Sequence, residues 1–349
     1  MSQKIILLSL FYSCLSFAQS KNVSHIDSIN VIKIYDTGEY ASFTDLLRFN
    51  NAFYCSFRVG AKHAGYEDYG KVRIIKSTDG INWKSIALME LNNLDLRDPK
   101  LSVTPDGRIM VILAGAVFDK DNQVKDLYPM VSFSNHNGVK FDNPRKVGLD
   151  PAIQPSKDWL WRVTWYDNIG YGINYQLKTN NKDRSKLDKD AWLLYLLKTN
   201  NGKSFEKVSQ LEVDYLPNES TIRFDKHKNM YVLVRRESGD KMGVLAKSSY
   251  PYTDWNYTDL DFRLGGPNFL FLNDNELVIG TRKYGEKNST NLLVTNLDGK
   301  VLKEVGLPSG GDTSYPGMVI FDKTLWVSFY STHEGKPNIY LAQLPLNSL

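Results

Sequence analysis

The stretch Ser77-Thr78-Asp79-Gly80-Ile81-Asn82-Trp83 decides the fold of this chain of 349 residues. A serine hydroxyl and an aspartate carboxylate can bond the backbone of a tight turn, glycine supplies a positive φ, and the aromatic ring packs beneath. Looser copies lie at 134–141 and 199–205, and remnants lie at 248–255 and 295–299. A turn that recurs along a chain indicates a repeated structural unit.

Most of these turns follow a predicted hairpin, and the hairpins recur six times. They span 46–54, 101–112, 163–175, 222–234, 269–279 and 318–329. Their starts are separated by 47 to 62 residues, and a period of about 50 residues built from short strands is typical of a β-propeller with one four-stranded blade per repeat. The sequence therefore predicts an all-β fold, a six-bladed β-propeller of antiparallel blades that forms one domain over residues 19–349.

A strand at 31–35 is left over by this count. We expect it to pair with the strand near 339–344, because pairing the first and last strands closes the ring and removes its open edges. The segment 178–190 is rich in lysine and asparagine, and we expect it to be a surface insertion.

The N-terminus reads as an export signal. Lys4 precedes an apolar stretch at 5–17 that is too short to span a bilayer, and Ser16-Phe17-Ala18 resembles a small-x-small cleavage site. We expect residues 1–18 to be a signal peptide and the mature protein to be secreted or periplasmic. Cys55 would then be the only cysteine, so no intramolecular disulfide is expected. No later segment is expected to cross a membrane.

The composition limits the classes of molecule that this protein is expected to bind. The net charge of +4 is small and dispersed, which argues against nucleic acid. No cluster has convincing metal-ligand spacing and no glycine loop suits a phosphate, so no metal or cofactor is expected. The 20 Tyr, 16 Phe and 7 Trp favour strands and suit stacking on sugars. We expect a monomer that binds a glycan.

Polar and aromatic residues stand at equivalent strand ends of the six repeats. Inner strands of a propeller converge on its central axis, and a repeat that only builds a core needs no such residues there. We therefore expect a functional site on the axis. The residues at these ends are Arg58, Arg97, Asp98, Trp161, Arg162, Glu219, Arg235, Arg236, Glu237, Arg282, Tyr315 and His333.

Several motifs resemble the sialidase superfamily. The 77–83 turn resembles the Asp-box of these propellers, and Ser314-Tyr315-Pro316-Gly317 is similar to the element that carries their nucleophilic tyrosine. Asn218-Glu219 is similar to the pair that carries the activating glutamate. The resemblance covers nearly the whole mature chain. It implies that Tyr315 is the nucleophile and Glu219 its base, which is coherent because a carboxylate that accepts the phenol proton makes the oxygen a better nucleophile.

The resemblance also implies a clamp and an acid. Arg236 and Arg282 fall where the family places arginines that bind a substrate carboxylate, and Asp98-Pro99 matches a recurring Asp-Pro. The family's acid comes from the loop that matches 60–70. Asp68 is the closest match in that loop, and His63 is its rival.

One departure concerns the substrate. Sialidases begin the first blade with Arg-Ile-Pro, whereas the matching stretch 42–46 has no arginine and carries Asp45. Arg58, Arg97 or Arg162 could substitute in the clamp. The resemblance implies a retaining hydrolase that releases terminal, acidic sugars. Alternatives are a propeller lyase or hydrolase for a uronic-acid-containing sugar, which would use His63 or His333, and a non-catalytic glycan-binding propeller.

Each candidate residue also has a structural alternative. Tyr315 could be a packed aromatic, Glu219 could bond turn amides, and Trp161 could be core rather than a sugar platform. Arg236 and Arg282 could form rim salt bridges, Asp45 and Asp98 could cap strands, Arg97 could only pair with Asp95 or Asp98, Asp312 could only shape its turn, and His63 and Asp68 could simply be exposed.

Overall fold

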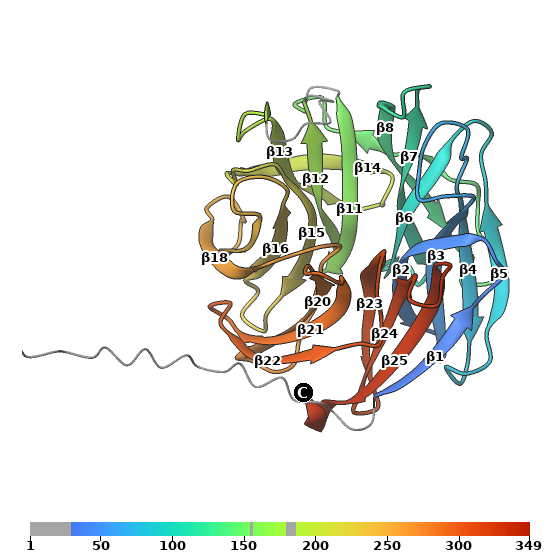
Figure 1. Cartoon of the computed structure of the whole chain (residues 1–349). Helices are drawn as coiled ribbons and strands as arrows, with labels where there is room; N and C mark the ends of the chain where they lie inside the picture. The colour runs from blue at the N-terminus through green and yellow to red at the C-terminus, as the bar shows by residue number, and fades with distance from the viewer. Residues whose placement is uncertain (1–28, 154–155, 179–185) are drawn as a thin grey trace, which may run out of the picture.

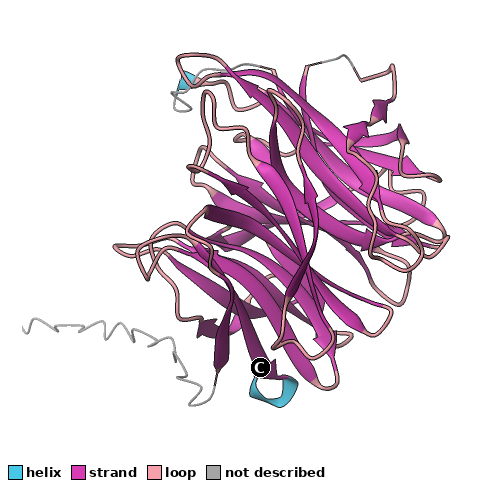
Figure 2. Cartoon of the chain, turned by 90° about the vertical axis from the view of Figure 1, so that its right-hand side faces the viewer, coloured by secondary structure: helices cyan, strands magenta, loops and turns pink. Residues whose placement is uncertain are grey.

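The computed structural model describes residues 29–153, 156–178 and 186–349. Six small sheets surround a central axis (Figure 1), so the prediction of an all-β, six-bladed β-propeller is confirmed. Strands account for nearly all regular structure (Figure 2), and the helical pieces are short turns such as η2 (Leu346–Ser348). The predicted signal segment 1–18 and part of the predicted 178–190 insertion lie outside the described residues.

Each blade is a run of consecutive antiparallel strands with the first strand innermost. Blade one holds β2 (Tyr40–Phe49), β3 (Ala52–Gly60), β4 (Lys71–Ser77) and β5 (Lys84–Met89), and blade two holds β6 (Asp95–Val103), β7 (Ile109–Phe118), β8 (Val124–Phe133) and β9 (Arg145–Lys146). Blade three holds β11 (Lys157–Tyr166), β12 (Ile169–Leu177), β13 (Trp192–Thr199) and β14 (Ser204–Leu211), with the short β10 (Gly148–Leu149) added parallel to β14. Blade four holds β15 (Pro217–Phe224), β16 (Met230–Arg236), β17 (Met242–Ser248) and β18 (Asn256–Arg263), and blade five holds β19 (Asn268–Phe271), β20 (Glu276–Lys283), β21 (Ser289–Asn296) and β22 (Val301–Gly306).

The sixth blade closes the ring. It combines β23 (Thr313–Phe321), β24 (Thr324–Ser331) and β25 (Asn338–Pro345) with the N-terminal β1 (Asn30–Tyr35). β1 runs antiparallel to β25, with Asn30 opposite Gln343. This confirms the expected pairing of the strand at 31–35 with the strand near 339–344. The next seam is tight, because a Cβ at Gly317 of β23 would lie 2.0 Å from the amide nitrogen of Leu46 in β2. Glycine is therefore required where blade six meets blade one.

The turn at 77–83 forms the local bonds that its sequence predicts. Asp79 Oδ1 accepts the backbone amides of Ile81 and Asn82, each at 2.8 Å, and Ser77 Oγ accepts the amide of Gly80 at 2.8 Å. The Trp83 indole donates to the carbonyl of Gly80 at 3.0 Å. These bonds stitch the third strand of the blade to its fourth.

The two ends of the ring carry different sets of loops. In an antiparallel blade, the first and third turns lie at one end and the second loop lies at the other. The second loop of blade one is 61–70, and we call this end of the ring the site end. Among the described residues, no helix has both the length and the apolar character needed to cross a membrane.

Candidate active site

Bulges in the inner strands aim side chains at the axis. The ladder between first and second strands skips two residues in β2, β6, β11, β15 and β23. A bulge bends its strand and redirects a side chain, and bulges are common beside active sites. The residues placed in these bulges are Phe43-Thr44, Asp98-Pro99, Trp161-Arg162, Asn218-Glu219 and Tyr315-Pro316.

Three of the bulged residues have a left-handed backbone. The φ angle is 60° at Phe43, 49° at Asp98 and 55° at Tyr315. A non-glycine residue in this region costs about 1–3 kcal/mol, and such positions cluster at functional sites. The same backbone conformation therefore recurs in the bulges of three blades.

Tyr315 and Glu219 meet across the axis. The Tyr315 hydroxyl donates to Glu219 Oε1 at 2.6 Å, although the two residues lie 96 positions apart. Glu219 Oε2 accepts from Arg235 Nη1 at 2.6 Å and from the amide of Gly266 at 2.9 Å. Both residues are buried, with Tyr315 9% and Glu219 6% exposed. The phenol is thus held by an ionised carboxylate whose other oxygen is already satisfied.

The protonation states of this pair follow from its surroundings. Burial alone would raise the pKa of Glu219, but the Arg235 charge and the hydrogen bonds from Tyr315, Arg235 and Gly266 outweigh it, so the pKa lies below its ordinary value. Burial, together with the Glu219 charge, holds the pKa of Tyr315 well above its ordinary value. The resting pair is therefore a neutral phenol and a carboxylate.

Arg235 lies at the axis, whereas its neighbour Arg236 does not. Arg235 Nη1 is 3.3 Å from the Tyr315 hydroxyl, and the Arg235 guanidinium also contacts Glu237. Arg236 instead donates to the carbonyl of Met242 at 2.6 Å and pairs with Asp240 at 2.9 Å. Neighbours in a strand point to opposite faces, so Arg236 belongs to the blade and not to the predicted clamp.

Arg282 is the predicted clamp residue that does lie beside the pair. Its Cζ is 5.7 Å from the centre of the Tyr315 ring. Its Nη2 donates to Asp312 Oδ1 at 3.1 Å and to the Tyr330 hydroxyl at 3.0 Å. The guanidinium is therefore already neutralised by a protein carboxylate.

Asp312 organises the mouth of the site. Its Oδ1 accepts from Tyr330 at 2.7 Å, its Oδ2 accepts from Tyr40, and His63 Nδ1 lies 2.9 Å from Oδ2. Burial would raise the pKa of Asp312, but the bonds from His63 and Tyr40 outweigh it and hold the pKa far below its ordinary value. The His63 side chain is 51% exposed. Its imidazole is thus anchored through Nδ1, which leaves Nε2 available to a ligand.

Asp68, the other candidate acid, is committed to the fold. Its Oδ2 pairs with Arg58 at 2.9 Å, and its Oδ1 accepts the amide of Ala61 at 2.8 Å. Burial would raise the pKa of Asp68, but the bonds from Arg58 and Ala61 hold it below its ordinary value. Arg58 is fully buried and also pairs with Asp95 at 2.7 Å. Arg58 and Asp68 therefore brace the 61–70 loop.

Asp98 and Arg97 lie close enough to Tyr315 and Glu219 for their charges to interact. Burial raises the pKa of Asp98 to about 6, although Arg97 lowers it in part. Arg97 Nε is 3.6 Å from Asp98 Oδ2, beyond hydrogen-bond length, while Arg97 Nη1 donates to Asp95 at 3.1 Å. The Arg97 guanidinium lies over the Phe43 ring at 5.0 Å. Asp98 is thus a buried carboxyl group that can carry a proton near neutral pH.

Two other predicted contact residues lie beneath the site. Both carboxylate oxygens of Asp45 accept from Arg162 Nη1, at 2.9 and 2.8 Å, and Oδ2 also accepts the backbone amide of Leu101 at 2.7 Å. Both partners of this pair are buried. The pair links the inner strands of blades one, two and three.

Trp161 is core rather than a sugar platform. It is 1% exposed, and its ring packs edge-on against Tyr315 with 5.8 Å between centres. Lys100 Nζ lies 4.7 Å from the centre of the Trp161 ring and 5.7 Å from that of Tyr315. Burial lowers the pKa of Lys100 to about 8. A buried ammonium group therefore sits under the candidate nucleophile.

The first-blade stretch brings an aromatic ring to the site in place of an arginine. The Phe43 ring lies 5.0 Å from those of Tyr315 and His63 and 5.6 Å from that of Tyr330. His333, the other predicted histidine, bonds Ser331 through Nδ1 at 2.8 Å and packs on Tyr340. Among the described residues, no group of three or more His, Cys, Asp or Glu side chains is placed to hold a metal ion.

Several site residues were given no role by the sequence analysis, because the sequence signals for such roles are weak. Arg235 and Glu237 stand two apart at a strand end, so they share a face, and this parity favours Arg235 over Arg236. Asp312 and Tyr330 both belong to blade six, whereas Tyr40 and His63 of blade one reach Asp312 only when blade six meets blade one. No local pattern marks that contact, and Lys100 resembles any strand lysine.

Comparison with known proteins shows the fold. No protein-family model matches the chain, and no curated protein matches its sequence. A protein of unknown function from Dyadobacter fermentans superposes with a TM-score of 0.75 at 17% identity, over 91% of this chain and 99% of that one. Trypanosoma rangeli sialidase, in complex with the inhibitor DANA, superposes with a TM-score of 0.70 at 8% identity.

The likeness to the sialidase covers 90% of this chain and 59% of that one, so this chain spans less than two thirds of the sialidase. An α-L-arabinofuranosidase from Fusarium graminearum superposes with a TM-score of 0.65 at 14% identity, over 91% of this chain and 98% of that one. The chain therefore forms a sialidase-like six-bladed propeller.

Proposed function

We propose that this chain is a retaining glycoside hydrolase that releases terminal sugars from glycans, with Tyr315 as nucleophile and Glu219 as its base. The observation that carries the proposal is the bond of 2.6 Å from the Tyr315 hydroxyl to Glu219 Oε1 on the propeller axis. A buried phenol packed only for stability needs no ionised partner, whereas a nucleophile needs a base within hydrogen-bond reach. The names of the sialidases and of the arabinofuranosidase that share this fold agree with glycoside cleavage.

The first step forms a covalent intermediate. The Tyr315 oxygen attacks the anomeric carbon, and its proton passes to Glu219. The bond from that carbon to the leaving oxygen breaks, and His63 donates a proton to the leaving oxygen. Arg235, which bonds both Glu219 and the phenol oxygen, stabilises charge that develops on the nucleophile.

The second step reverses these transfers. Water gives a proton to His63 while its oxygen attacks the anomeric carbon, and the Tyr315 oxygen leaves and recovers its proton from Glu219. Two displacements retain the configuration of the sugar.

His63 is the better acid of the two candidates. Its side chain is 51% exposed at the mouth and is oriented by Asp312 at 2.9 Å. Asp68 is 6% exposed, and its oxygens already accept from Arg58 and from backbone amides. A carboxylate with a lowered pKa is also a poor proton donor.

The charges around the pair favour an uncharged terminal sugar over sialic acid. Arg235 and Arg282 are both paired with protein carboxylates, and Phe43 stands near the nucleophile where the resemblance called for an arginine. A substrate carboxylate would have to displace Asp312 from the partly buried Arg282 or Glu219 from the buried Arg235, and breaking the buried pair costs several kcal/mol. An acidic sugar is the second candidate, because Arg235 and Arg282 both lie close to the Tyr315 ring or hydroxyl.

The test compares Tyr315→Phe with Tyr54→Phe. Tyr54 is a fully buried tyrosine in blade one that plays no part in the site, so it controls for loss of a buried hydroxyl. Both proteins are assayed on 4-methylumbelliferyl glycosides of neutral and acidic sugars, and the product anomer is followed by NMR. Tyr315→Phe should lower kcat by about 10³-fold or more with the fold intact, while Tyr54→Phe should keep wild-type kcat.

Full activity of Tyr315→Phe would overturn the assignment. An unsaturated product that absorbs in the ultraviolet would instead identify a lyase, and glycan binding without any product would identify a binding propeller.

Export is part of the same proposal. A secreted or periplasmic glycosidase would lose residues 1–18, so N-terminal sequencing of the mature protein should begin near Gln19. A mature protein that still begins at Met1 would contradict it.

A further inference from the structure

A cleft of about 410 Å³ opens between blades three and four at the end of the ring opposite the site end. Its lining comes from the first turn of blade three, between β11 and β12, and from the first and third turns of blade four. Four tyrosines line this cleft, which we call the tyrosine cleft: Tyr166, Tyr171, Tyr250 and Tyr252. Ligand pockets in proteins measure about 300–1,000 Å³, so the cleft is large enough for a small ligand.

The four rings are held in place by contacts with other aromatic rings. Tyr166 stacks on Phe224 with 4.2 Å between ring centres. Tyr252 lies edge-on to Tyr171 at 5.6 Å and to Tyr250 at 5.7 Å. Tyr250 is nevertheless 78% exposed. An exposed ring that is already held by its neighbours loses little entropy when a ligand packs on it.

The fold leaves three of the four phenol hydroxyls without a partner. The Tyr252 hydroxyl donates to a backbone carbonyl at 3.0 Å. The hydroxyls of Tyr166, Tyr171 and Tyr250 have no hydrogen-bond partner among the described residues. Tyr171 is only 8% exposed, and burial, with smaller effects from Tyr250 and Asp167, raises the pKa of its hydroxyl. This neutral hydroxyl can both donate and accept a hydrogen bond, and a ligand would supply the partner that the protein does not.

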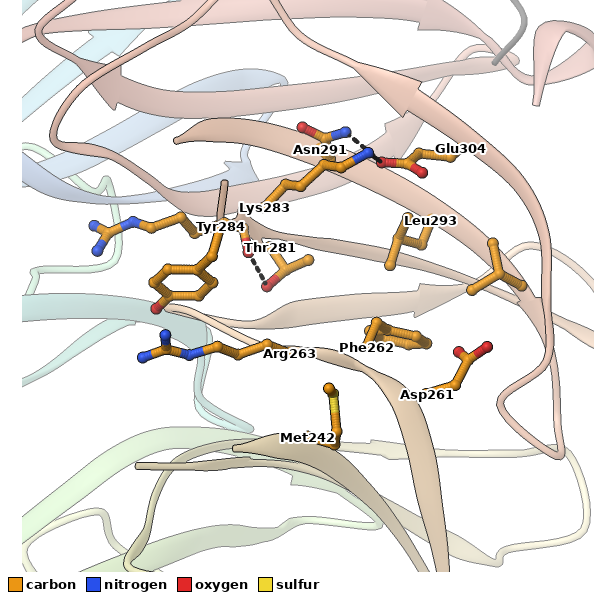
Figure 3. A pocket seen from close by; sticks show the side chains of 12 residues that line it. Met242, Asp261, Phe262, Arg263, Thr281, Lys283, Tyr284, Asn291, Leu293 and Glu304 are labelled. Carbon is orange, nitrogen blue, oxygen red and sulfur yellow. Dashed lines mark hydrogen bonds and ion pairs between the residues drawn. The ribbon is translucent and has the colours of Figure 1, made fainter. Parts of the chain in front are cut away.

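The lining of the tyrosine cleft carries no net charge. Its single cation, Lys228, pairs with its single carboxylate, Asp167, at 3.1 Å. A cleft of about 320 Å³ between blades four and five differs (Figure 3), because Lys283 and Asn291 in its lining both bond Glu304, at 2.6 and 2.7 Å. There the polar groups already bond one another. The tyrosine cleft instead suits a neutral ligand that offers both hydroxyl groups and an apolar face.

A sugar ring has this combination of groups. Its C–H face packs on aromatic rings, and its hydroxyls both donate and accept hydrogen bonds. A proline-rich peptide also packs on aromatic side chains, but its backbone offers carbonyl acceptors and few N–H donors. Because the free phenol hydroxyls can accept as well as donate, they favour the sugar.

We propose that the tyrosine cleft is a non-catalytic binding site for a neutral glycan. The proposal does not rest on the proposed function, because the cleft and the candidate active site lie at opposite ends of the ring. The exposed Tyr250 ring packs on one face of a sugar unit, and the Tyr171 hydroxyl bonds one of its hydroxyls. A polysaccharide bound here would hold the protein in place and leave the site end open.

Affinity electrophoresis of the full chain tests this proposal. The gels contain arabinan, xylan or galactomannan as neutral polysaccharides, or polygalacturonic acid as the acidic comparison. At least one neutral polysaccharide should retard wild type. Tyr171→Phe, which removes only the hydroxyl, should raise the Kd for that polysaccharide at least about 3-fold. Tyr250→Ala, which removes the exposed ring, should raise it at least about 10-fold.

Each variant has a matched control. Tyr54→Phe removes a buried, unpartnered hydroxyl from blade one, and Tyr257→Ala removes a ring that is 40% exposed on blade four and lies outside the cleft. Both controls should keep the wild-type Kd. Tyr171→Phe should also keep the wild-type melting temperature, because the hydroxyl that it removes bonds no described residue.

Three outcomes would overturn the proposal. The first is equal retardation of wild type, Tyr171→Phe and Tyr250→Ala. The second is no retardation of wild type by any of the neutral polysaccharides. The third is binding of decaproline that both substitutions weaken, without binding of a neutral polysaccharide, which would assign the cleft to a peptide.

Turnover separates this proposal from the proposed function. Tyr250→Ala should cleave the 4-methylumbelliferyl glycosides with the wild-type kcat. Retardation that depends on Tyr171 and Tyr250 in a protein that cleaves no glycoside would support the cleft and contradict the hydrolase. Cleavage by a protein whose retardation does not depend on these residues would support the hydrolase and contradict the cleft.

Discussion

At the scale of single residues, Asp98 couples stability to pH. Its carboxyl group is buried, and its pKa is raised to about 6, above the value of about 3.9 in an unfolded chain. The folded state therefore holds this proton where the unfolded state has lost it. Stability contributed by Asp98 is present below about pH 4 and is lost as the pH rises to about 6.

Asp98→Asn should remove this dependence. We expect the variant to be more stable than wild type at pH 7 by about 3 kcal/mol, and to match it near pH 4, in urea unfolding at both values. Asp95→Asn is the contrast, because Asp95 bonds Arg58 and Arg97 and its loss should destabilise at pH 7. A difference between Asp98→Asn and wild type that is the same at both pH values would contradict the raised pKa.

His63 and Asp68 should separate catalysis from stability. His63→Gln removes the proposed acid from an exposed position, so it should lower kcat by about 10²-fold, with little change in urea stability. Asp68→Asn leaves Arg58 buried with one carboxylate fewer, so it should lower the free energy of unfolding by about 3 kcal/mol. Normal kcat in His63→Gln would show that His63 is not the acid. Loss of kcat in folded Asp68→Asn would show that Asp68 takes part in catalysis and does not only brace the loop.

The sequence predicts some of these residues and misses others for a physical reason. Tyr315, Glu219 and Arg282 stand at strand ends that the repeat brings to one axis, and the structure does bring them together. Arg235 and Arg236 are adjacent, and only the parity of β16 decides which one faces the axis. A register error of one residue exchanges the two faces of a strand.

At the scale of elements, the turn before β19 acts on the site through a glycine. Gly266 has a φ of 60°, its amide donates to Glu219, and a Cβ there would lie 2.5 Å from Cγ of Tyr315. The absence of a side chain is what lets the backbone reach the carboxylate beneath the phenol ring.

Gly266→Ala should therefore lower activity as well as stability. We expect kcat to fall at least 10-fold as Tyr315 is displaced from Glu219, and the free energy of unfolding to fall by more than the cost of about 1 kcal/mol for φ strain alone. Gly107→Ala is the control, because Gly107 has a φ of 76° with no atom within 4 Å of its Cβ position. Equal effects of the two substitutions on kcat would rule out displacement of Tyr315.

The elements themselves were the best-predicted part of the structure. All six hairpins and the closing strand carry apolar runs bounded by turn residues, which local sequence encodes directly. The short β10 was not predicted. It has two residues, and two residues cannot show a periodic pattern.

At the scale of the whole molecule, β1 protects the edge of β25. A chain that starts at residue 37 lacks β1, so β25 would present unpaired backbone groups that invite association with another chain. We expect this truncation to lower the melting temperature and to form oligomers in size-exclusion chromatography. A chain that starts at residue 29 keeps β1 and is the control. Identical melting temperatures of the two chains would show that the pairing of β1 with β25 does not stabilise the fold.

The choice of sugar could not be predicted at any smaller scale. It depends on whether Arg235 and Arg282 are free to bind a substrate carboxylate or are already paired with protein carboxylates. The residues that pair with them come from other parts of the chain. His63 and Asp312 are 249 positions apart, and the contact that anchors the imidazole exists only when blade six meets blade one. The repeat predicts the ring, but the pairing of charges across seams belongs to the assembled molecule.

The seam between β1 and β25 also sets the order of folding. Each blade is made of neighbouring strands that can pair as soon as they are synthesised, except the last. Asn30 must wait for Gln343, so this contact has one of the longest sequence separations in the chain and carries a large loop-closure entropy. The ring is therefore expected to assemble blade by blade and to remain open until its final strand arrives. Sealing of the seam would then be the slow, last step that commits the chain to its native state.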